Sequence, residues 1–397
     1  MANIYDGSGQ IIETVNPFDT PIITGELPVV FIESDTAYTS LTKATASDGT
    51  VEFVDGKKKF KLPVKIKLQG SGALNYAKKN LNFTFYNESG KKQKIIFNDW
   101  YPTNKIHLKA NEYDYSMCRN SVGAILTWKY MGRMLPKGAW GYIRSFPVIM
   151  YYNGVYMGCH TWNMPQDGKT YNFSDESEEA CTNLAYRCGT VTSNTWSQVS
   201  DWEYRGDVDE TADMNSTFSA LLAIMANTSG LTKEVIEAHF DVQTLLAYMV
   251  FCQISCAVDS MTNNWTLVTW DGVKWYHTFY DLDICFGIGG NDGRNISATK
   301  DVFTSIQGGY NTFFATVKTL YETEFNEMWA TFRNNGADVE TITKAFADFQ
   351  GKWGWQNLKA ERDKWGSDKL TSRDIDMIGS WLTERFANFD NIYNYGG

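Results

Sequence analysis

The chain has 397 residues, of which 43% are hydrophobic and 15% aromatic, and its formal net charge is −10. This composition is typical of a globular protein with a substantial core and excludes wholesale disorder. The negative charge argues against a nucleic-acid or anionic-membrane binder, because such proteins need a positive field. No stretch approaches the roughly 20 apolar residues of a membrane span, and the N-terminus lacks the basic start and apolar run of a signal peptide.

The seven cysteines form no CxxC pair, and an odd count in a chain of this length favours reduced thiols. Cys159, His160, Cys181 and Cys188 are residue types that bind zinc, but their spacing matches no standard zinc pattern. We therefore expect buried structural thiols.

The N-terminal half is predicted to be rich in strands. Residues 1–26 show little regular periodicity and contain two prolines, which indicates an arm or tether. The apolar run at 29–32 predicts the first strand, and alternation over 64–68 and 81–85 predicts two half-buried strands. A further strand is expected near 95–97.

A helix and a tight hairpin are expected to follow. Apolar spacing over 113–131 predicts an amphipathic helix that begins near Asp114. In FPVIMYYNGVYMGCHTW, the dipeptide Asn153-Gly154 predicts a two-residue hairpin turn between two strands.

The C-terminal half is predicted to be mostly helical, which makes the fold class α+β. After an irregular polar insertion at about 171–213, helices are expected at 214–226, 232–239 and 241 to about 258. The last of these is apolar nearly all round, as a buried helix would be. A hairpin around Asp271-Gly272 comes next, and helices dominate from residue 311 to the end.

The stretch from Asp259 to Gly287 holds the candidate catalytic residues. It places Asp259 directly after the buried helix, Asn264 five residues later, and Asp281 and Asp283 after the hairpin. On a strand, residues two apart face the same way, so we expect Asp281 and Asp283 to converge on one cation, with Leu282 packed behind. Carboxylate oxygens suit Mg²⁺ or Mn²⁺.

The same spacing occurs in protein kinases. There, a catalytic Asp is followed at the fifth residue by a metal-binding Asn, and a metal-binding Asp follows a hairpin later. Because Asp, Asn and Gly are also favoured loop residues, the pattern in isolation fits an ordinary loop as well.

The order of segments resembles the CotH kinase family over residues 27–392. The similar segments are LPVVFI, IKLQGSGALNYAKKNLNFTF, KIHLKANEYDYSMCRNSVG, VIMYYNGVYMG, NNW with KWYHTFYDLDICFG, and the closing SWLTERFANFD. The resemblance implies an atypical protein-kinase-like, two-lobed fold with an N-lobe at about 27–165 and a C-lobe at about 214–392.

The resemblance also implies an activity and a set of site residues. It implies transfer of the ATP γ-phosphoryl group, with Mg or Mn, to Ser or Thr of a protein, including the chain itself. Asp259 is then the catalytic residue, and Asn264, Asp281 and Asp283 are the metal ligands. Lys78 or Lys79 would contact the nucleotide phosphates, and Arg119 and Asn120 would line the cleft. The alternatives are a solvated lysine pair at a sheet edge, and an ordinary ion pair between Arg119 and Asp114.

The chain departs from the family pattern in two places. Where the family has Arg-Gly-Asn-Ser, this chain has Gln69-Gly70-Ser71-Gly72, whose glycines would still let backbone N–H groups approach phosphates. Where a Glu usually follows the hairpin, this chain has Asn163, Met164 and Pro165, with Asp167 as the nearest carboxylate. A missing partner for the lysine would weaken nucleotide positioning.

Two other functions remain open from the sequence. MANIYDGSGQII resembles the leader segments of phage tail and head-fibre proteins, so the chain is either a phage-encoded kinase or an inactive kinase-like structural or host-binding component of a particle. Its expected location is the cytoplasm of the producing cell or the virion, and its N-terminal arm would bind phage structural proteins. Carbohydrate recognition by surface Trp and Tyr is a third reading, although aromatic residues more often build a core.

Overall fold

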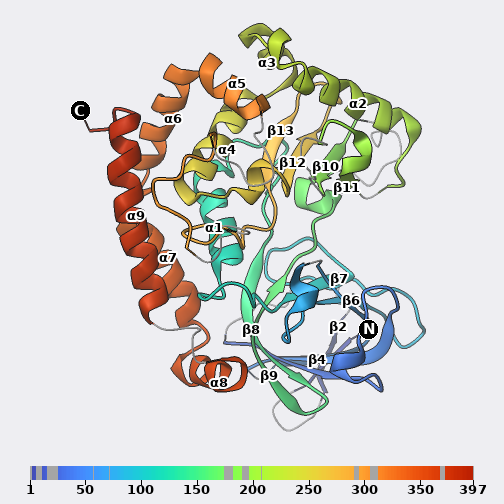
Figure 1. Cartoon of the computed structure of the whole chain (residues 1–397). Helices are drawn as coiled ribbons and strands as arrows, with labels where there is room; N and C mark the ends of the chain where they lie inside the picture. Colours follow the sequence, from blue (N-terminus) through green and yellow to red (C-terminus); the bar gives the residue numbers. More distant parts are fainter. Residues whose placement is uncertain are drawn as a thin grey trace. The chain divides into compact units, whose positions relative to one another are not determined.

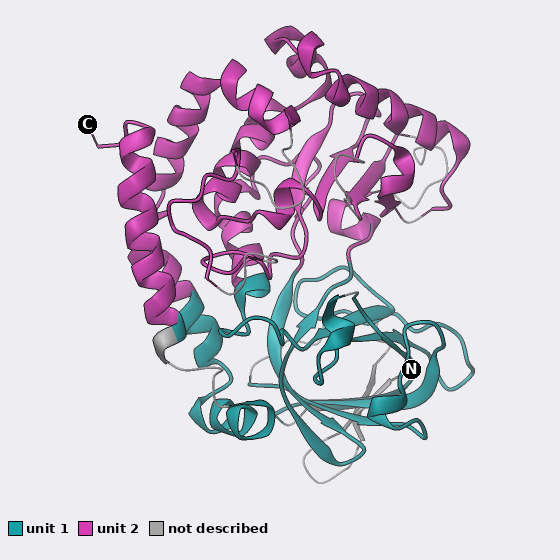
Figure 2. Ribbon diagram, in the orientation of Figure 1, with its two compact units in different colours: residues 1–121, 144–165, 346–374 teal, residues 122–143, 166–345, 375–397 magenta. Residues whose placement is uncertain are grey.

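The structure is a computed structural model, and it describes residues 2–5, 11–15, 26–56, 58–70, 72–173, 182–189, 196–206, 208–289, 295–304, 312–366 and 372–396. The chain forms two compact units, each built from several segments (Figure 2). Unit 1 contains residues 1–121, 144–165 and 346–374, and unit 2 contains residues 122–143, 166–345 and 375–397.

Unit 1 contains a closed seven-stranded barrel with the strand order β3-β4-β5-β6-β7-β9-β8 (Figure 1). Its strands are β3 (Val29–Glu33), β4 (Ser47–Asp55), β5 (Lys58–Leu68), β6 (Leu81–Phe85), β7 (Lys105–Lys109), β8 (Ser145–Tyr152) and β9 (Val155–Asn163). Neighbouring strands are antiparallel, except that β3 pairs with β8 in parallel and so closes the barrel. A separate pair, β1 (Ala2–Tyr5) and β2 (Ile11–Val15), precedes the barrel.

Aromatic side chains fill the barrel, because alternate strand residues point inward. Trp162 is fully buried, and its ring lies 5.3 Å from the Phe53 ring and 5.5 Å from the Phe97 ring. Phe60, Phe83, Phe85 and Phe146 surround the same group. The alternation read from the sequence at 64–68 and 81–85 is therefore confirmed as β5 and β6, which pair with each other.

The predicted hairpin is also confirmed. Strands β8 and β9 are joined by Asn153 and Gly154, which both have positive φ, 47° and 74°. Two positive φ values are what a tight hairpin turn needs, and Asn and Gly are the residues that adopt them most readily.

Three N-terminal expectations differ from the structure. The expected strand near 95–97 is an isolated bridge between Ile95 and Thr103, and the first 26 residues contain two strands. The helix expected from Asp114 is α1 (Arg119–Met131), which begins five residues later. The delay has a local cause: Asp114 accepts hydrogen bonds from the backbone N–H of Ser116 and Arg119, and Met117 has a φ of 58°. A carboxylate bonded to nearby backbone competes with helix formation.

Unit 2 contains a four-stranded antiparallel sheet and most of the helices. The sheet order is β11 (Trp202–Tyr204), β10 (Leu184–Cys188), β12 (Trp265–Thr269) and β13 (Tyr276–Phe279). The helices are α2 (Ala212–Ala226), α3 (Lys233–His239), α4 (Val242–Ser255), α5 (Thr312–Leu320), α6 (Glu322–Asn334), α7 (Val339–Gly351), α8 (Trp355–Trp365) and α9 (Ser372–Ile392). Helices α1, α7 and α9 extend into both units, and α8 belongs to unit 1.

The predicted helices at 214–226, 232–239 and 241–258 are confirmed as α2, α3 and α4. Helix α4 is buried along almost its whole length, and Asp241 caps its start by accepting a hydrogen bond from the backbone N–H of Thr244. The polar insertion at 171–213 is more regular than expected, because β10 and β11 lie in it and β10 pairs with β12. The α+β class with a sheet-rich first half and a helical second half is confirmed.

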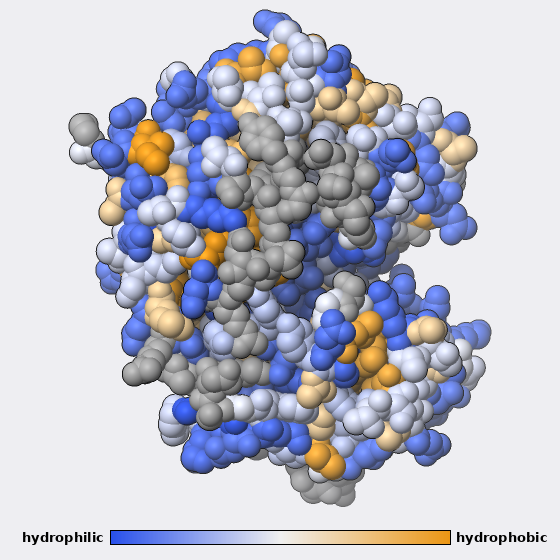
Figure 3. Space-filling view, in the orientation of Figure 1, coloured by the Kyte–Doolittle hydropathy of each residue, from blue (hydrophilic) through white to orange (hydrophobic). Residues whose placement is uncertain are grey.

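Six of the seven cysteines lie in the described residues, where all six are buried and none forms a disulfide; Cys181 lies outside them. In the part of the chain that the structure describes, no helix combines the length and apolar character that a bilayer crossing requires. The face in Figure 3 shows hydrophobic residues in small separate patches on a mostly hydrophilic surface.

A buried ion pair fixes helix α8 to the barrel of unit 1. The ammonium group of Lys78 lies 2.8 Å from Glu361 Oε1, and neither side chain is exposed to solvent. Lys78 also donates to the carbonyl oxygens of Ala110 and Cys159, at 3.3 and 2.5 Å. The second oxygen of Glu361 accepts the backbone N–H of Cys159 at 2.8 Å. Every ammonium proton therefore has an acceptor, which is the condition under which a buried pair is tolerated.

Gly158 makes room for this pair. Its φ is 96°, and a Cβ atom there would lie 1.9 Å from Glu361 Oε2. Gly158, the second glycine of the NGVYMG segment, is thus required both by its backbone conformation and by the close approach of the Glu361 carboxylate.

We predict that Glu361→Gln lowers the free energy of unfolding by about 3–5 kcal/mol, because it leaves the Lys78 charge buried without a counter-charge. Urea unfolding followed by circular dichroism measures the change. The exposed pair between Lys359 and Asp363 on the same helix provides the control, since both side chains are 63% exposed. Asp363→Asn should cost less than about 0.5 kcal/mol.

A double variant separates this charge effect from a general packing effect. Lys78→Met combined with Glu361→Gln should cost less than the sum of the two single changes, because no unpaired charge remains. A cost for Glu361→Gln as small as that of Asp363→Asn would contradict the role assigned to the pair.

Candidate active site

The end of helix α4 positions the candidate catalytic residue in unit 2. Cys256 ends the helix with a φ of 51°, and a short 3-10 helix, Asp259–Met261, follows three residues later. The hydroxyl of buried Tyr248 on α4 donates to the carbonyl oxygen of Ser260 at 2.5 Å. The helix that the sequence marks as fully buried therefore anchors the turn that carries Asp259.

Two asparagine side chains bind the Asp259 carboxylate. Asn263 Nδ2 donates to one oxygen at 3.0 Å, and Asn264 Nδ2 donates to the other at 2.6 Å. The φ of Asn264 is 54°, and its backbone N–H donates to the carbonyl oxygen of Cys188 on β10. The interval of five residues predicted from the sequence thus corresponds to a direct side-chain contact between Asp259 and Asn264.

The pKa of Asp259 is raised from its ordinary value of 3.8. Desolvation is the largest cause, and the negative charge of Asp281 acts in the same direction. Hydrogen bonds from Asn263 and Asn264 and the positive charge of Arg187 oppose the shift without cancelling it. A raised carboxyl pKa beside a second carboxylate is the pattern expected of a general base or a cation site.

The predicted geometry of Asp281 and Asp283 needs correction. Strand β13 ends at Phe279, Asp281 has a φ of 54°, and Asp283 lies in a turn, so the strand rule that residues two apart face the same way does not apply. Leu282 is buried as expected, and it packs so close to Gly123 of α1 that a Cβ atom there would lie 2.9 Å from Leu282 Cβ. The loop is tied to α4 by a hydrogen bond from Phe286 N–H to Ser255 O.

The residues of this loop suit an oxygen-bound divalent cation. Asp259 and Asp281 lie close enough to raise a pKa by repulsion, and a cation would relieve that repulsion. The side-chain oxygen of Asn264 accepts no hydrogen bond from the residues that the structure describes. Within the same residues, no three Asp, Glu, His or Cys side chains come together as a preformed metal site, so asparagine oxygen would have to complete the ligand set.

In unit 1, the two candidate nucleotide lysines differ in their surroundings. Lys78 is wholly buried and uses its ammonium group on Glu361, Ala110 and Cys159, so the sheet-edge alternative does not hold for it. Lys79 is half-buried, and its ammonium group donates to the carbonyl oxygen of Leu74 at 2.7 Å.

Arg119 and Asn120 stand at the start of α1 and not in the middle of a helix as predicted. Arg119 forms an ion pair with Asp114, and both side chains are buried. This is the ion pair that the sequence left open as the alternative. Asn120 is buried as well.

The carboxylate that pairs with Lys78 comes from a distant part of the chain and not from the segment after the hairpin. Asp167, the nearest carboxylate in sequence, caps a short 3-10 helix by accepting the backbone N–H of Lys169. Glu361 is the partner of Lys78 instead. The close approach at Gly158 was the available signal, but a single sequence does not say which residue fills the space above a glycine. Ser71 of the altered loop lies outside the described residues, and the φ of Gly70 is 98°.

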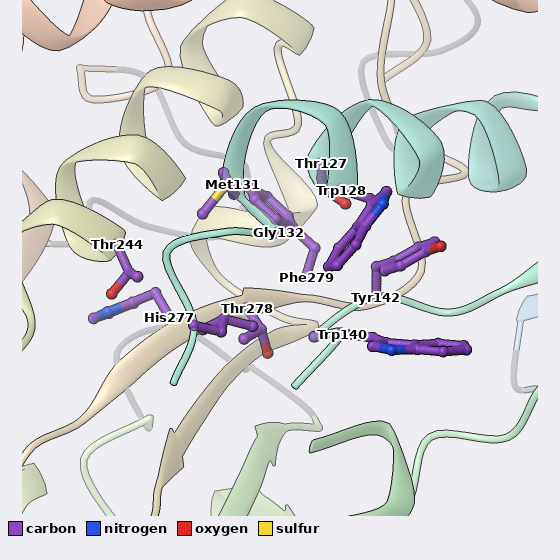
Figure 4. Close-up of a pocket in the computed structure, with 12 residues that line it drawn as sticks. Thr127, Trp128, Met131, Gly132, Trp140, Tyr142, Thr244, His277, Thr278 and Phe279 are labelled. Atoms are coloured by element: carbon purple, nitrogen blue, oxygen red, sulfur yellow. The ribbon is translucent and has the colours of Figure 1, made fainter. Parts of the chain in front are cut away.

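A narrow crevice in unit 2 lies between α1, α4 and β13 (Figure 4). Trp128 and Tyr142 stack at one end with their rings 5.2 Å apart, and Thr244 and His277 lie at the other. Burial lowers the pKa of His277 to about 3, so the imidazole is neutral. The free volume is about 10 Å³, which is room for one water molecule and not for a nucleotide.

The raised pKa of Asp259 leads to a prediction for Asp281→Asn. A carboxyl that binds its proton more tightly when folded costs stability as the pH rises above its ordinary value of 3.8. Removing the Asp281 charge removes part of that cost. We expect the free energy of unfolding of the variant to rise relative to the unmodified protein by on the order of 1 kcal/mol between pH 4 and pH 7. Urea unfolding at a series of pH values measures it.

Asp271→Asn is the control with the opposite sign. Desolvation opposes the shift, but hydrogen bonds from the backbone of Lys274 and Val273 lower the pKa of Asp271. Its charge therefore stabilises the folded state above its ordinary pKa, and the variant should lose stability relative to the unmodified protein as the pH rises. If the free energy of unfolding changes with pH in the same way in both variants, repulsion between Asp259 and Asp281 is ruled out.

A comparison with protein-family models identifies the family of the chain. The model described as CotH kinase protein matches residues 66–387, which is most of the sequence and includes both Lys78 and the Asp259–Asp283 stretch. A search of curated proteins found no match. The chain belongs to the CotH kinase family.

Proposed function

We propose that the protein is an ATP-dependent protein kinase of CotH type that transfers the γ-phosphoryl group to Ser or Thr with Mg or Mn. The observation that carries the proposal is the group formed by Asp259, its two asparagines and the neighbouring Asp281. It has the residue types and the spacing that phosphoryl transfer by kinases uses. We further propose that units 1 and 2 correspond to the two lobes of a kinase-like fold.

Asp259 is assigned the role of orienting the acceptor hydroxyl and taking its proton. The hydroxyl oxygen attacks the γ-phosphorus, the bond from that phosphorus to the bridging oxygen breaks, ADP leaves, and the proton passes to the carboxylate. The raised pKa of Asp259 favours proton uptake, and the hydrogen bonds from Asn263 and Asn264 hold the carboxylate in place. Asn264, Asp281 and Asp283 would hold the metal, which when bound neutralises phosphate charge.

Lys78 is assigned the part of the kinase lysine that pairs with a glutamate. In protein kinases such an ion pair positions the nucleotide phosphates. Here Glu361 supplies the carboxylate. Because all three ammonium protons already have acceptors, a phosphate oxygen would have to replace one of the two backbone carbonyls. Lys79, Arg119 and Asn120 complete the proposed nucleotide-binding set.

The occupied Lys78 and the altered Gln69–Gly72 loop favour a second candidate function. In it, the fold is retained as an inactive structural or host-binding component of a phage particle, attached through the segment at 1–26. The partner in the first function is an acceptor protein, including the chain itself, and the partner in the second is a phage structural protein.

Labelled ATP separates the two functions. We expect the purified protein to transfer label to itself or to a Ser/Thr-rich acceptor when Mg²⁺ or Mn²⁺ is present. Asp259→Ala and Asp283→Ala should each lower the rate by about 100-fold or more, because they remove the proton acceptor and a metal ligand.

Asp271→Asn is the matched control, because it changes an acidic residue of the hairpin that precedes Asp281 and Asp283 without touching the proposed site. Its rate should stay within about twofold of the unmodified protein. No transfer by the unmodified protein, together with no rise in melting temperature on adding ATP and metal, would exclude the kinase. Equal labelling in both alanine variants would identify a contaminating kinase.

A further inference from the structure

Two arginines lie on one face of the sheet in unit 2, beside Asp259. Arg187 on β10 is directly opposite Glu203 on β11, and Arg205 is two residues beyond Glu203. Directly opposed residues share a face of a sheet, and Arg205, which follows the end of β11, donates its backbone N–H to Ala185 on β10 and pairs with the same Glu203 carboxylate. The three side chains therefore extend from the same face.

The two guanidinium groups share a single carboxylate. Arg187 and Arg205 both form ion pairs with the same oxygen, Glu203 Oε2. Their side chains are only 14% and 28% exposed, whereas that of Glu203 is 50% exposed. The Nε atoms of both arginines are buried and have no hydrogen-bond partner among the described residues. Buried donors without acceptors are costly, so Glu203 alone does not satisfy the two arginines, and the exposed parts of both side chains leave room for an anion.

Two guanidinium groups face one carboxylate at Glu203. Burial and the neighbouring charge of Arg187 lower the pKa of Arg205 to about 10. Two cations held together in a partly buried place are destabilising unless more than one carboxylate compensates them. Arg187 also interacts with the Asp259 carboxyl, whereas Glu203 is the carboxylate with which Arg205 forms an ion pair. A tetrahedral anion offers several oxygens, and arginine binds such oxygens in pairs.

The arginines lie next to the proposed site of phosphoryl transfer. The carbonyl of Cys188, the residue after Arg187, accepts the backbone N–H of Asn264 at 2.9 Å. The Arg187 guanidinium stacks on the Tyr280 ring at 4.3 Å, and Tyr280 directly precedes Asp281. The charge of Arg187 also acts on the carboxyl of Asp259. All these contacts lie within unit 2.

We propose that Arg187 and Arg205 form a phosphate-binding site, which Glu203 occupies when no ligand is bound. Displacing the half-exposed Glu203 carboxylate frees both guanidinium groups for the oxygens of the ligand. The phosphate belongs either to the nucleotide or to a phosphorylated side chain of the acceptor protein. Only this choice of source rests on the proposed kinase function.

Calorimetric titration of the full-length protein with inorganic pyrophosphate, without metal, tests the site. Glu203→Gln removes the competing carboxylate and should tighten binding on the order of tenfold. Arg205→Gln should weaken binding by about the same factor, since it removes a charged donor. Weaker binding by Arg205→Gln could also come from misfolding. Tighter binding by Glu203→Gln could not, so the second variant keeps the test decisive.

Glu324→Gln is the matched control. Glu324 is also in unit 2 and pairs with Lys233, and both side chains are 40% exposed. The substitution changes the net charge by the same amount and also releases a paired cation. If it tightens pyrophosphate binding as much as Glu203→Gln, or if Glu203→Gln has no effect, the site is excluded.

The same titrations with ADP and with phosphoserine identify the source of the phosphate. If Glu203→Gln raises the affinity for ADP, the site binds the phosphate of the nucleotide. If it raises the affinity for phosphoserine alone, the site binds a phosphorylated side chain of the acceptor protein. The protein could fail to transfer label from ATP and still bind pyrophosphate more tightly as Glu203→Gln and more weakly as Arg205→Gln. That result would support the phosphate-binding site and exclude the kinase activity. The two failures are therefore distinguishable.

Discussion

The organisation of unit 1 depends on the buried ion pair between Lys78 and Glu361. One charge comes from the bend that precedes β6 and the other from a helix more than two hundred residues later, and neither is exposed to water. A charge removed from water must be compensated within the protein, so α8 is held by electrostatics as well as by apolar contact with the barrel. Gly158 and the carbonyl oxygens of Ala110 and Cys159 are arranged around this requirement.

Local patterns predicted the parts of the fold that local physics determines. Three predictions depend on residues that are close together in sequence, and all three are confirmed. They are the alternation in β5 and β6, the Asn153-Gly154 turn, and helix α4, which is apolar nearly all round. The errors occur where an element starts or ends. Asp114 delays α1 by binding nearby N–H groups, and β13 ends at Phe279, before the two aspartates that it was expected to align.

The candidate site shows the same division. The interval from Asp259 to Asn264 is local, and it corresponds to a hydrogen bond. Glu361 and the arginine pair escaped prediction because each depends on a pairing between distant segments that one sequence does not encode in any regular interval. Family resemblance supplied the expectation of a glutamate near the hairpin, whereas the carboxylate that pairs with Lys78 is Glu361 of α8.

The discontinuous origin of unit 1 has a consequence for how the protein is made. The barrel strands emerge from the ribosome well before Glu361, which is 202 residues after Cys159. At roughly 5–20 residues per second, that interval lasts on the order of 10–40 s. During it, a newly closed barrel would contain a lysine without its counter-ion, so the nascent chain either leaves the barrel open there or keeps water at Lys78. Synthesis of α8 would then complete the N-terminal unit.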